Sequence, residues 1–113
     1  MAQRTFVIAE AGVNHNGDRA LAERLVDAAA DAGADAVKFQ TFRTEALVTA
    51  SAAQARYQTE NTGVAESQAA MLRRLELSME AHRALLARAA ARGITFLSTP
   101  FDLGSIDCLA SLG

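Results

Sequence analysis

The chain has 113 residues, half of them hydrophobic, and its 11 Lys and Arg residues are balanced by 13 Asp and Glu residues. This composition is typical of a soluble globular protein, and the lack of a basic excess argues against a protein that binds nucleic-acid phosphates. The first apolar run, residues 6–9, is too short for a signal peptide or a membrane span. A single cysteine, Cys108, excludes an intramolecular disulfide and fits a reducing compartment, so we expect a cytoplasmic protein.

Short apolar runs predict strands, which we place at residues 6–10, 36–42 and 94–99. Ala11 and Gly12 end the first run. Pro100 halts the third, because proline has no N–H group to donate to a neighbouring strand.

Helices are predicted between and after these strands, where apolar residues recur with a period of 3.6. We place them at about residues 19–32, at 66–75, from Ser78 to about residue 92, and onward from Asp102 or Ser105. Asp18 and Ser78 are residue types that cap helix N-termini. The predicted apolar face of the first helix holds Leu21, Leu25, Ala28, Ala29 and Ala32. Residues 43 to about 63 show no sustained period.

The alternation of strands and helices predicts an α/β protein with a parallel sheet built from βαβ units. Such units occur in open doubly wound sheets and in closed barrels, and a closed barrel requires roughly 250 residues. Three parallel strands alone would leave two unpaired edges and a weak core. The sequence therefore favours a piece of a barrel.

Polar side chains occur at the carboxyl ends of all the predicted strands. Lys38 and Gln40 are two residues apart and therefore share one face of the second strand, while the apolar Val37 and Phe39 share the other. Glu10 ends the first strand, and Ser98 and Thr99 end the third. Because the carboxyl ends of barrel strands form the active-site mouth, this coincidence indicates a functional site.

Structural explanations compete with a functional one at several of these positions. Glu10 could be a solvated carboxylate, a helix cap or the partner of Lys38 in a purely structural ion pair. Ser98 and Thr99 before Pro100 could simply end the strand. His15 lies in a turn, where backbone capping is at least as good an explanation as catalysis. We expect His82 to be solvated on a helix surface and Cys108 to be a small core residue, and the two histidines do not suggest a metal pair.

The sequence resembles the N-acetylneuraminate (sialic acid) synthase family. Three motifs carry the resemblance, IAEAGVNHNGD at residues 8–18, AGADAVKFQTF at 32–42 and FLSTPFD at 96–102, and it covers essentially the whole chain. The first motif is closer to the neuraminate and legionaminate type than to the pseudaminate type.

The resemblance implies a (β/α)8 TIM barrel, of which residues 1–113 would be the N-terminal portion with about the first three βα units. The family's C-terminal antifreeze-like domain is absent from this chain, and the family works as a homodimer. Its members are transferases that condense phosphoenolpyruvate with N-acetylmannosamine or a related N-acyl amino sugar, giving a nine-carbon α-keto acid and phosphate. They use a divalent metal, Mn²⁺ or Mg²⁺, whose ligands we expect outside this chain, since neither His15 nor His82 matches them.

The resemblance also implies roles for individual residues. Glu10 matches the family's active-site glutamate, and Lys38 and Gln40 match residues that bind phosphoenolpyruvate and the second substrate. Thr99 matches a residue that contacts phosphoenolpyruvate. Asn61 corresponds to an asparagine that contacts the sugar, in a long loop that aligns loosely with the family.

Two other readings stay open. Lys38 could be the Schiff-base lysine of a barrel aldolase, or the chain could be a non-catalytic binding or scaffolding fragment. We expect a polypeptide that ends at Gly113 to have no turnover, because the later strands of the family carry the metal ligands and further phosphate contacts.

Overall fold

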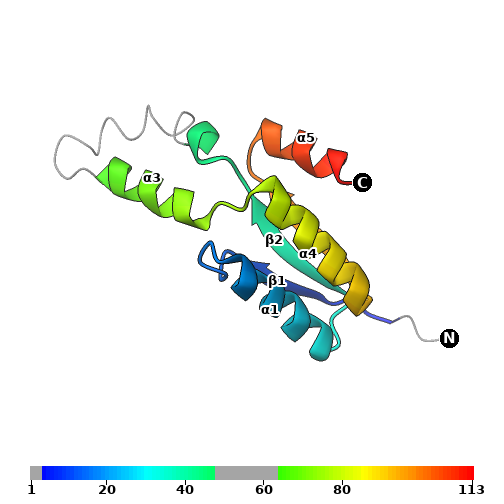
Figure 1. Cartoon of the computed structure of the whole chain (residues 1–113). Helices are drawn as coiled ribbons and strands as arrows, with labels where there is room; N and C mark the ends of the chain where they lie inside the picture. The colour runs from blue at the N-terminus through cyan, green and yellow to red at the C-terminus, as the bar shows by residue number, and fades with distance from the viewer. Residues whose placement is uncertain (1–3, 48–63) are drawn as a thin grey trace.

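The computed structural model describes residues 4–47 and 64–113, in which strands and helices alternate as the sequence predicts (Figure 1). In chain order the elements are β1 (Ile8–Gly12), α1 (Arg19–Asp31), β2 (Ala36–Thr41), α3 (Val64–Leu75), α4 (Met79–Arg92), β3 (Thr95–Pro100) and α5 (Leu103–Ser111). No helix within these described ranges has the length and apolar composition needed to cross a membrane.

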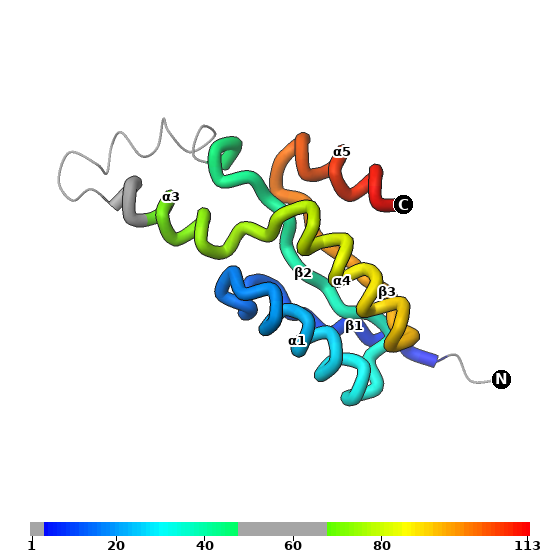
Figure 2. Tube along the Cα trace, in the orientation of Figure 1, coloured from blue at the N-terminus to red at the C-terminus, as the bar shows by residue number. Residues whose placement is uncertain are grey.

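The sheet is parallel, with β2 between β1 and β3 (Figure 2). Its register pairs Glu10 with Lys38 and Gln40 with Thr99. The parallel sheet confirms the predicted α/β class, and within the described residues the sheet has three strands.

β1 begins and ends two residues later than predicted. Val7 N donates a hydrogen bond to Asp35 Oδ2, just before β2, at 2.8 Å. Regular strand pairing therefore starts only at Ile8. At the other end the register shifts between Glu10 and Gly12, which pairs with Phe39 and leaves Ala11 as the extra residue of a bulge. Bulges of this kind re-aim the side chains beside them.

The core lies between the sheet and the helices α1 and α4. Val37 and Phe39 of β2 are buried against Val26 of α1 and Leu85 of α4. The ring of Phe39 stacks on that of Phe96 with centroids 5.8 Å apart. We call this side of the sheet the helix face and the side that carries Lys38 and Gln40 the site face.

The predicted apolar face of α1 is partly wrong. The residues that α1 buries are Ala22, Val26 and Ala29, whereas Ala28 and Ala32 are exposed. Small side chains at the contact let α1 lie close to both the sheet and α4. Leu25, Ala28 and Ala32 instead border a shallow apolar hollow beside β1.

The predicted helix caps are confirmed. Asp18 Oδ1 accepts from Ala20 N at 2.8 Å, and Ser78 Oγ accepts from Ala81 N at 3.0 Å. Asp102, not Ser105, caps α5, since its Oδ1 accepts from Ser105 N at 2.7 Å.

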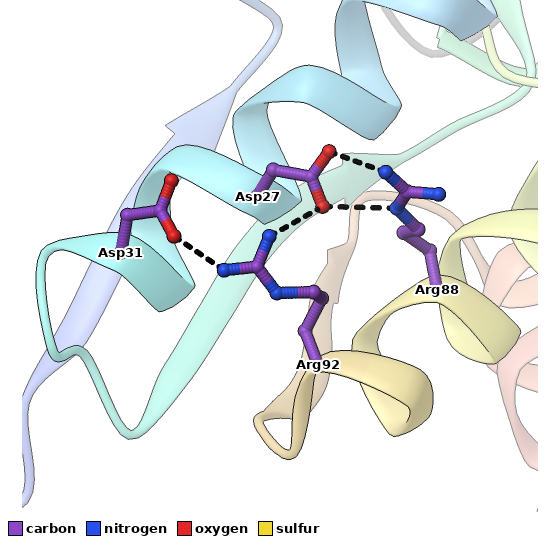
Figure 3. A network of polar contacts seen from close by, with 4 residues as sticks. All are labelled: Asp27, Asp31, Arg88 and Arg92. Carbon is purple, nitrogen blue, oxygen red and sulfur yellow. Dashed lines mark hydrogen bonds and ion pairs between the residues drawn. The ribbon is translucent and has the colours of Figure 1, made fainter.

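An ion-pair network joins α1 to α4 on the outside of the molecule (Figure 3). Asp27 accepts from Arg88 Nε at 2.9 Å and Nη2 at 2.6 Å, and from Arg92 Nη1 at 3.2 Å. Arg92 also pairs with Asp31. The hydrogen bonds from Arg88 are the main reason that the pKa of Asp27 lies below its usual range. The network joins the two helices beside the core contact that they share.

Candidate functional site

An ion pair between neighbouring strands forms the centre of the site face. Lys38 Nζ lies 3.2 Å from Glu10 Oε2, and the two side chains remain 37% and 50% exposed. Lys38 is the only lysine in the sequence, beside ten arginines. The Glu10–Lys38 ion pair, which the sequence offered as one possibility, is thus present in the structure. Because both side chains are partly exposed, their charged groups are accessible to a ligand.

Gln40 and Thr99 extend this centre toward the carboxyl ends of β2 and β3. They are paired in register, and strand alternation places them on the site face. Gly12 lies beside them, with a φ of +56°. A Cβ atom added at Gly12 would be 3.3 Å from Glu10 Oε1 and 3.6 Å from Gln40 Nε2. The glycine thus leaves space between two of the predicted site residues.

Ser98 does not share this face. Its hydroxyl lies 2.6 Å from Thr41 Oγ1, on the helix face, so of the adjacent pair Ser98 and Thr99 only Thr99 belongs to the site. The structure therefore brings Glu10, Lys38, Gln40 and Thr99 together on one face. Asn61, the predicted sugar contact, lies outside the described residues.

An apolar cavity of about 230 Å³ adjoins Gln40. It opens where the three strands end, beneath α3, and Gln40 supplies its polar side chain. Its other lining residues are Val13, Phe42, Leu47, Leu72, Leu75 and Phe101. A ligand held by the charged centre would have apolar surface next to it.

His82 is buried, so its predicted solvated position is wrong. It is only 1% exposed, its Nε2 lies 2.7 Å from Thr41 Oγ1, and its Nδ1 lies 2.7 Å from the carbonyl oxygen of Ser78. The signal was in the helical period, because His82 precedes Leu85 and Ala89 by three and seven residues and both are buried.

His15 is also buried, and of the two explanations left open for it the structure shows the backbone-capping one. Its Nδ1 accepts from Gly17 N at 2.8 Å, while its Nε2 has no partner among the described residues. The ring packs toward Phe39, with centroids 6.1 Å apart, which places it on the helix face and away from Glu10. Burial, and then the charge of His82, lower the pKa of His15.

Cys108 is half-buried and is not part of the core, contrary to prediction. Its sulfur accepts from the guanidinium of Arg43 at 3.9 Å. Asp102 also reaches this segment, since it accepts from Arg43 N at 2.8 Å. Burial alone would raise the pKa of Asp102, but hydrogen bonds from Arg43 N and Ser105 outweigh burial and lower it. These contacts tie the segment after β2 to α5.

The site face offers a metal few ligands. Within residues 4–47 and 64–113, no three His, Cys, Asp or Glu side chains gather closely enough to hold an ion. Glu10 alone does not make up the ligand set that Mn²⁺ or Mg²⁺ requires. Ligands outside this chain stay a prediction.

Comparison with known proteins gives a consistent family. The model of the NeuB family matches residues 25–113. The chain is 50% identical to an N,N'-diacetyllegionaminic acid synthase of Campylobacter jejuni over 98% of this chain and 33% of the relative. It is 55% identical to the synthase of the same name from Legionella pneumophila, over 96% of this chain and 30% of the relative. Thus the chain spans about a third of the length of these relatives.

A solved structure agrees with them. The N-acetylneuraminic acid (sialic acid) synthetase of Leptospira borgpetersenii, in complex with citrate, superposes with a TM-score of 0.76 at 32% identity. The match covers 98% of this chain and 34% of that one.

Proposed function

The chain belongs to the NeuB family, and on that premise we propose that the protein carrying it condenses phosphoenolpyruvate with an N-acyl amino sugar. N-acetylmannosamine and its diacetylated relatives are the substrate class, and the products are phosphate and a nine-carbon α-keto acid. One observation carries the proposal: Glu10, Lys38, Gln40 and Thr99 lie on one face at the ends of adjacent parallel strands.

The chemistry of this face suits phosphoenolpyruvate. The ligand brings a carboxylate and a phosphate, both of which favour a fixed ammonium group and neutral donors. Lys38 supplies the ammonium, and the amide of Gln40 and the hydroxyl of Thr99 supply donors. We assign the ligand's anionic groups to these three side chains.

Glu10 repels anions and therefore belongs to the sugar side of the reaction. Its carboxylate holds the ammonium of Lys38 in place and can hydrogen-bond a hydroxyl or amide of the sugar. The methylene carbon of phosphoenolpyruvate forms a bond to the aldehyde carbon of the sugar, and the aldehyde oxygen takes up a proton and becomes a hydroxyl. Water adds to the former enol carbon, whose C–O bond to phosphate then breaks, which releases phosphate and leaves the α-keto group. Holding the two carbons face to face is a large part of the acceleration.

The surroundings support a closed barrel around this face. Phe6, Val7 and Ile8 at β1 are exposed, as are Leu103 and Ile106 of α5. Large exposed apolar side chains beside open strands are typical of surfaces that further elements cover. A (β/α)8 barrel, a C-terminal antifreeze-like domain, a homodimer and a cytoplasmic location all belong to the proposal. A divalent metal belongs to it as well, but the residues present do not form its site, and no step is assigned to it.

The direct test is product formation by the full-length protein. We expect phosphate release that requires both phosphoenolpyruvate and the amino sugar, with the α-keto acid identified by mass spectrometry. Glu10→Gln should lower kcat at least a hundredfold, while Glu80→Gln, at an exposed position on α4, should leave it unchanged.

Borohydride separates the aldolase reading from this one. Since Lys38 is the only lysine of the chain, reduction in the presence of pyruvate would place a covalent adduct there if Lys38 formed a Schiff base. An adduct on Lys38, or phosphate release without the sugar, would count against the proposed condensation.

A further inference from the structure

We infer that His82 is a positioning residue: through Thr41 and Ser98 it holds the ends of β2 and β3 so that Gln40 and Thr99 face the substrate. This inference rests on the proposed function. It adds to the site a residue that lies on the helix face, opposite the site face.

A series of hydrogen bonds links the Ser78 carbonyl, His82, Thr41 and Ser98. The Ser78 carbonyl can only accept, so His82 Nδ1 carries the proton and donates to it across 2.7 Å. His82 Nε2 and Thr41 Oγ1 are hydrogen-bonded at 2.7 Å, and Nε2 accepts from the hydroxyl whenever Nδ1 carries the only ring proton. The hydroxyls of Thr41 and Ser98 are in turn hydrogen-bonded to each other at 2.6 Å. Every member of the chain has a partner.

The middle of this hydrogen-bond series is buried, while Ser98 at its end is half-buried. His82 and Thr41 are 1% and 5% exposed, and the ring of Phe96 meets His82 edge-on with centroids 6.4 Å apart. Removal of one member would leave a buried polar group without a partner, which costs more than the bond itself contributes. The two strand ends are thus held in one arrangement.

The register carries this constraint to the site face. Phe39 pairs with Ser98, Gln40 with Thr99 and Thr41 with Pro100. Because side chains alternate along a strand, Thr41 and Ser98 on the helix face fix the backbone on which Gln40 and Thr99 point the other way. Since Gln40 and Thr99 are assigned to the anionic groups of phosphoenolpyruvate, their displacement would weaken binding of this substrate.

Two substitutions of His82 by residues with side-chain amides test its two hydrogen bonds one at a time. In His82→Asn the amide nitrogen takes the place of Nδ1, which keeps the bond to Ser78 and loses Thr41. In His82→Gln the amide oxygen takes the place of Nε2, which keeps Thr41 and loses Ser78. Thr41→Val and Thr41→Ser form a second pair that leaves His82 intact, since valine removes the hydroxyl and serine retains it.

The experiment measures the dissociation constant of phosphoenolpyruvate and its KM in the full-length protein. We expect His82→Asn and Thr41→Val to weaken binding and raise KM at least tenfold, with kcat changed less. His82→Gln and Thr41→Ser should stay within about threefold of the wild type. A merely structural role would instead lower the thermal midpoint of both His82 variants and leave the ratio of their affinities near one.

Failures of the two proposals are distinguishable. A wild-type protein that binds no phosphoenolpyruvate would overturn the proposed function and this inference with it. A wild-type protein that binds it, alongside Asn and Val variants that bind equally well, would overturn the inference alone. Equal losses in the Asn and Gln variants, with Thr41→Val unaffected, would do the same.

Discussion

Lys38→Met removes the ammonium from the centre of the site face while retaining much of the side chain's apolar length. The question is whether the pair with Glu10 exists for stability or for a ligand. Two unit charges 3.2 Å apart attract by about 5 kcal/mol at an effective dielectric constant of about 20. Solvent and side-chain entropy offset most of that attraction in exposed pairs, which contribute about 0.2–1 kcal/mol net.

At 37% and 50% exposure the Lys38–Glu10 pair belongs with these exposed pairs. The substitution should therefore lower the free energy of unfolding by less than about 1 kcal/mol. A charge-assisted hydrogen bond to a bound anion contributes about 1.5–3 kcal/mol, so affinity for phosphoenolpyruvate should fall about 10- to 150-fold.

Calorimetric titration with phosphoenolpyruvate and urea unfolding, both on the full-length protein, measure the two quantities. Arg83→Met, at an exposed position on α4, is the control and should change neither. Loss of several kcal/mol of stability with unchanged affinity would refute the reasoning and make the pair structural.

Further predictions concern the fold around the site. The pKa of His15 in the folded state lies below its ordinary value of 6.5, so the unfolded chain binds more protons near pH 6. The contribution of His15 to the free energy of unfolding is therefore complete above pH 6.5 and decreases as the pH drops below that value. His15→Asn should reduce this pH dependence in urea titrations from pH 7 to pH 5. Gly17→Ala would set a Cβ 1.6 Å from the backbone oxygen of Arg74, whereas Gly93→Ala meets nothing within 4 Å at a similar positive φ. We expect Gly93→Ala to cost about 1 kcal/mol from backbone strain alone and Gly17→Ala clearly more, and equal costs in urea unfolding would disprove the predicted clash. Asp27→Asn should lower the thermal midpoint in dilute buffer and much less in about 1 M salt, which screens the charges that Asp27 shares with α4.

The orientation of the β2 side chains was predictable because the strand alternates apolar and polar residues. Val37 and Phe39 alternate with Lys38 and Gln40, and a buried face next to a polar one leaves a single way to place the strand. Glu10 and Thr99 followed from where their strands end. The family motifs assigned these residues to substrates, which strand alternation alone does not do.

The errors have a common physical origin in contacts between elements. The burial of His82 follows from the helical period, but its hydrogen-bond partner Thr41 lies on β2 and could not be read from α4 alone. The start of β1 depends on Asp35, which is distant in sequence and takes the N–H of Val7. The buried side of α1 depends on α4, because the helix packs against two partners at once.

The most direct test of the central claim is a crystal structure of the full-length protein with phosphoenolpyruvate bound. The account predicts that Lys38 Nζ, Gln40 and Thr99 contact the ligand's carboxylate or phosphate on the site face, with Glu10 toward the sugar. Phosphoenolpyruvate bound elsewhere, with Lys38 still paired only to Glu10, would contradict it.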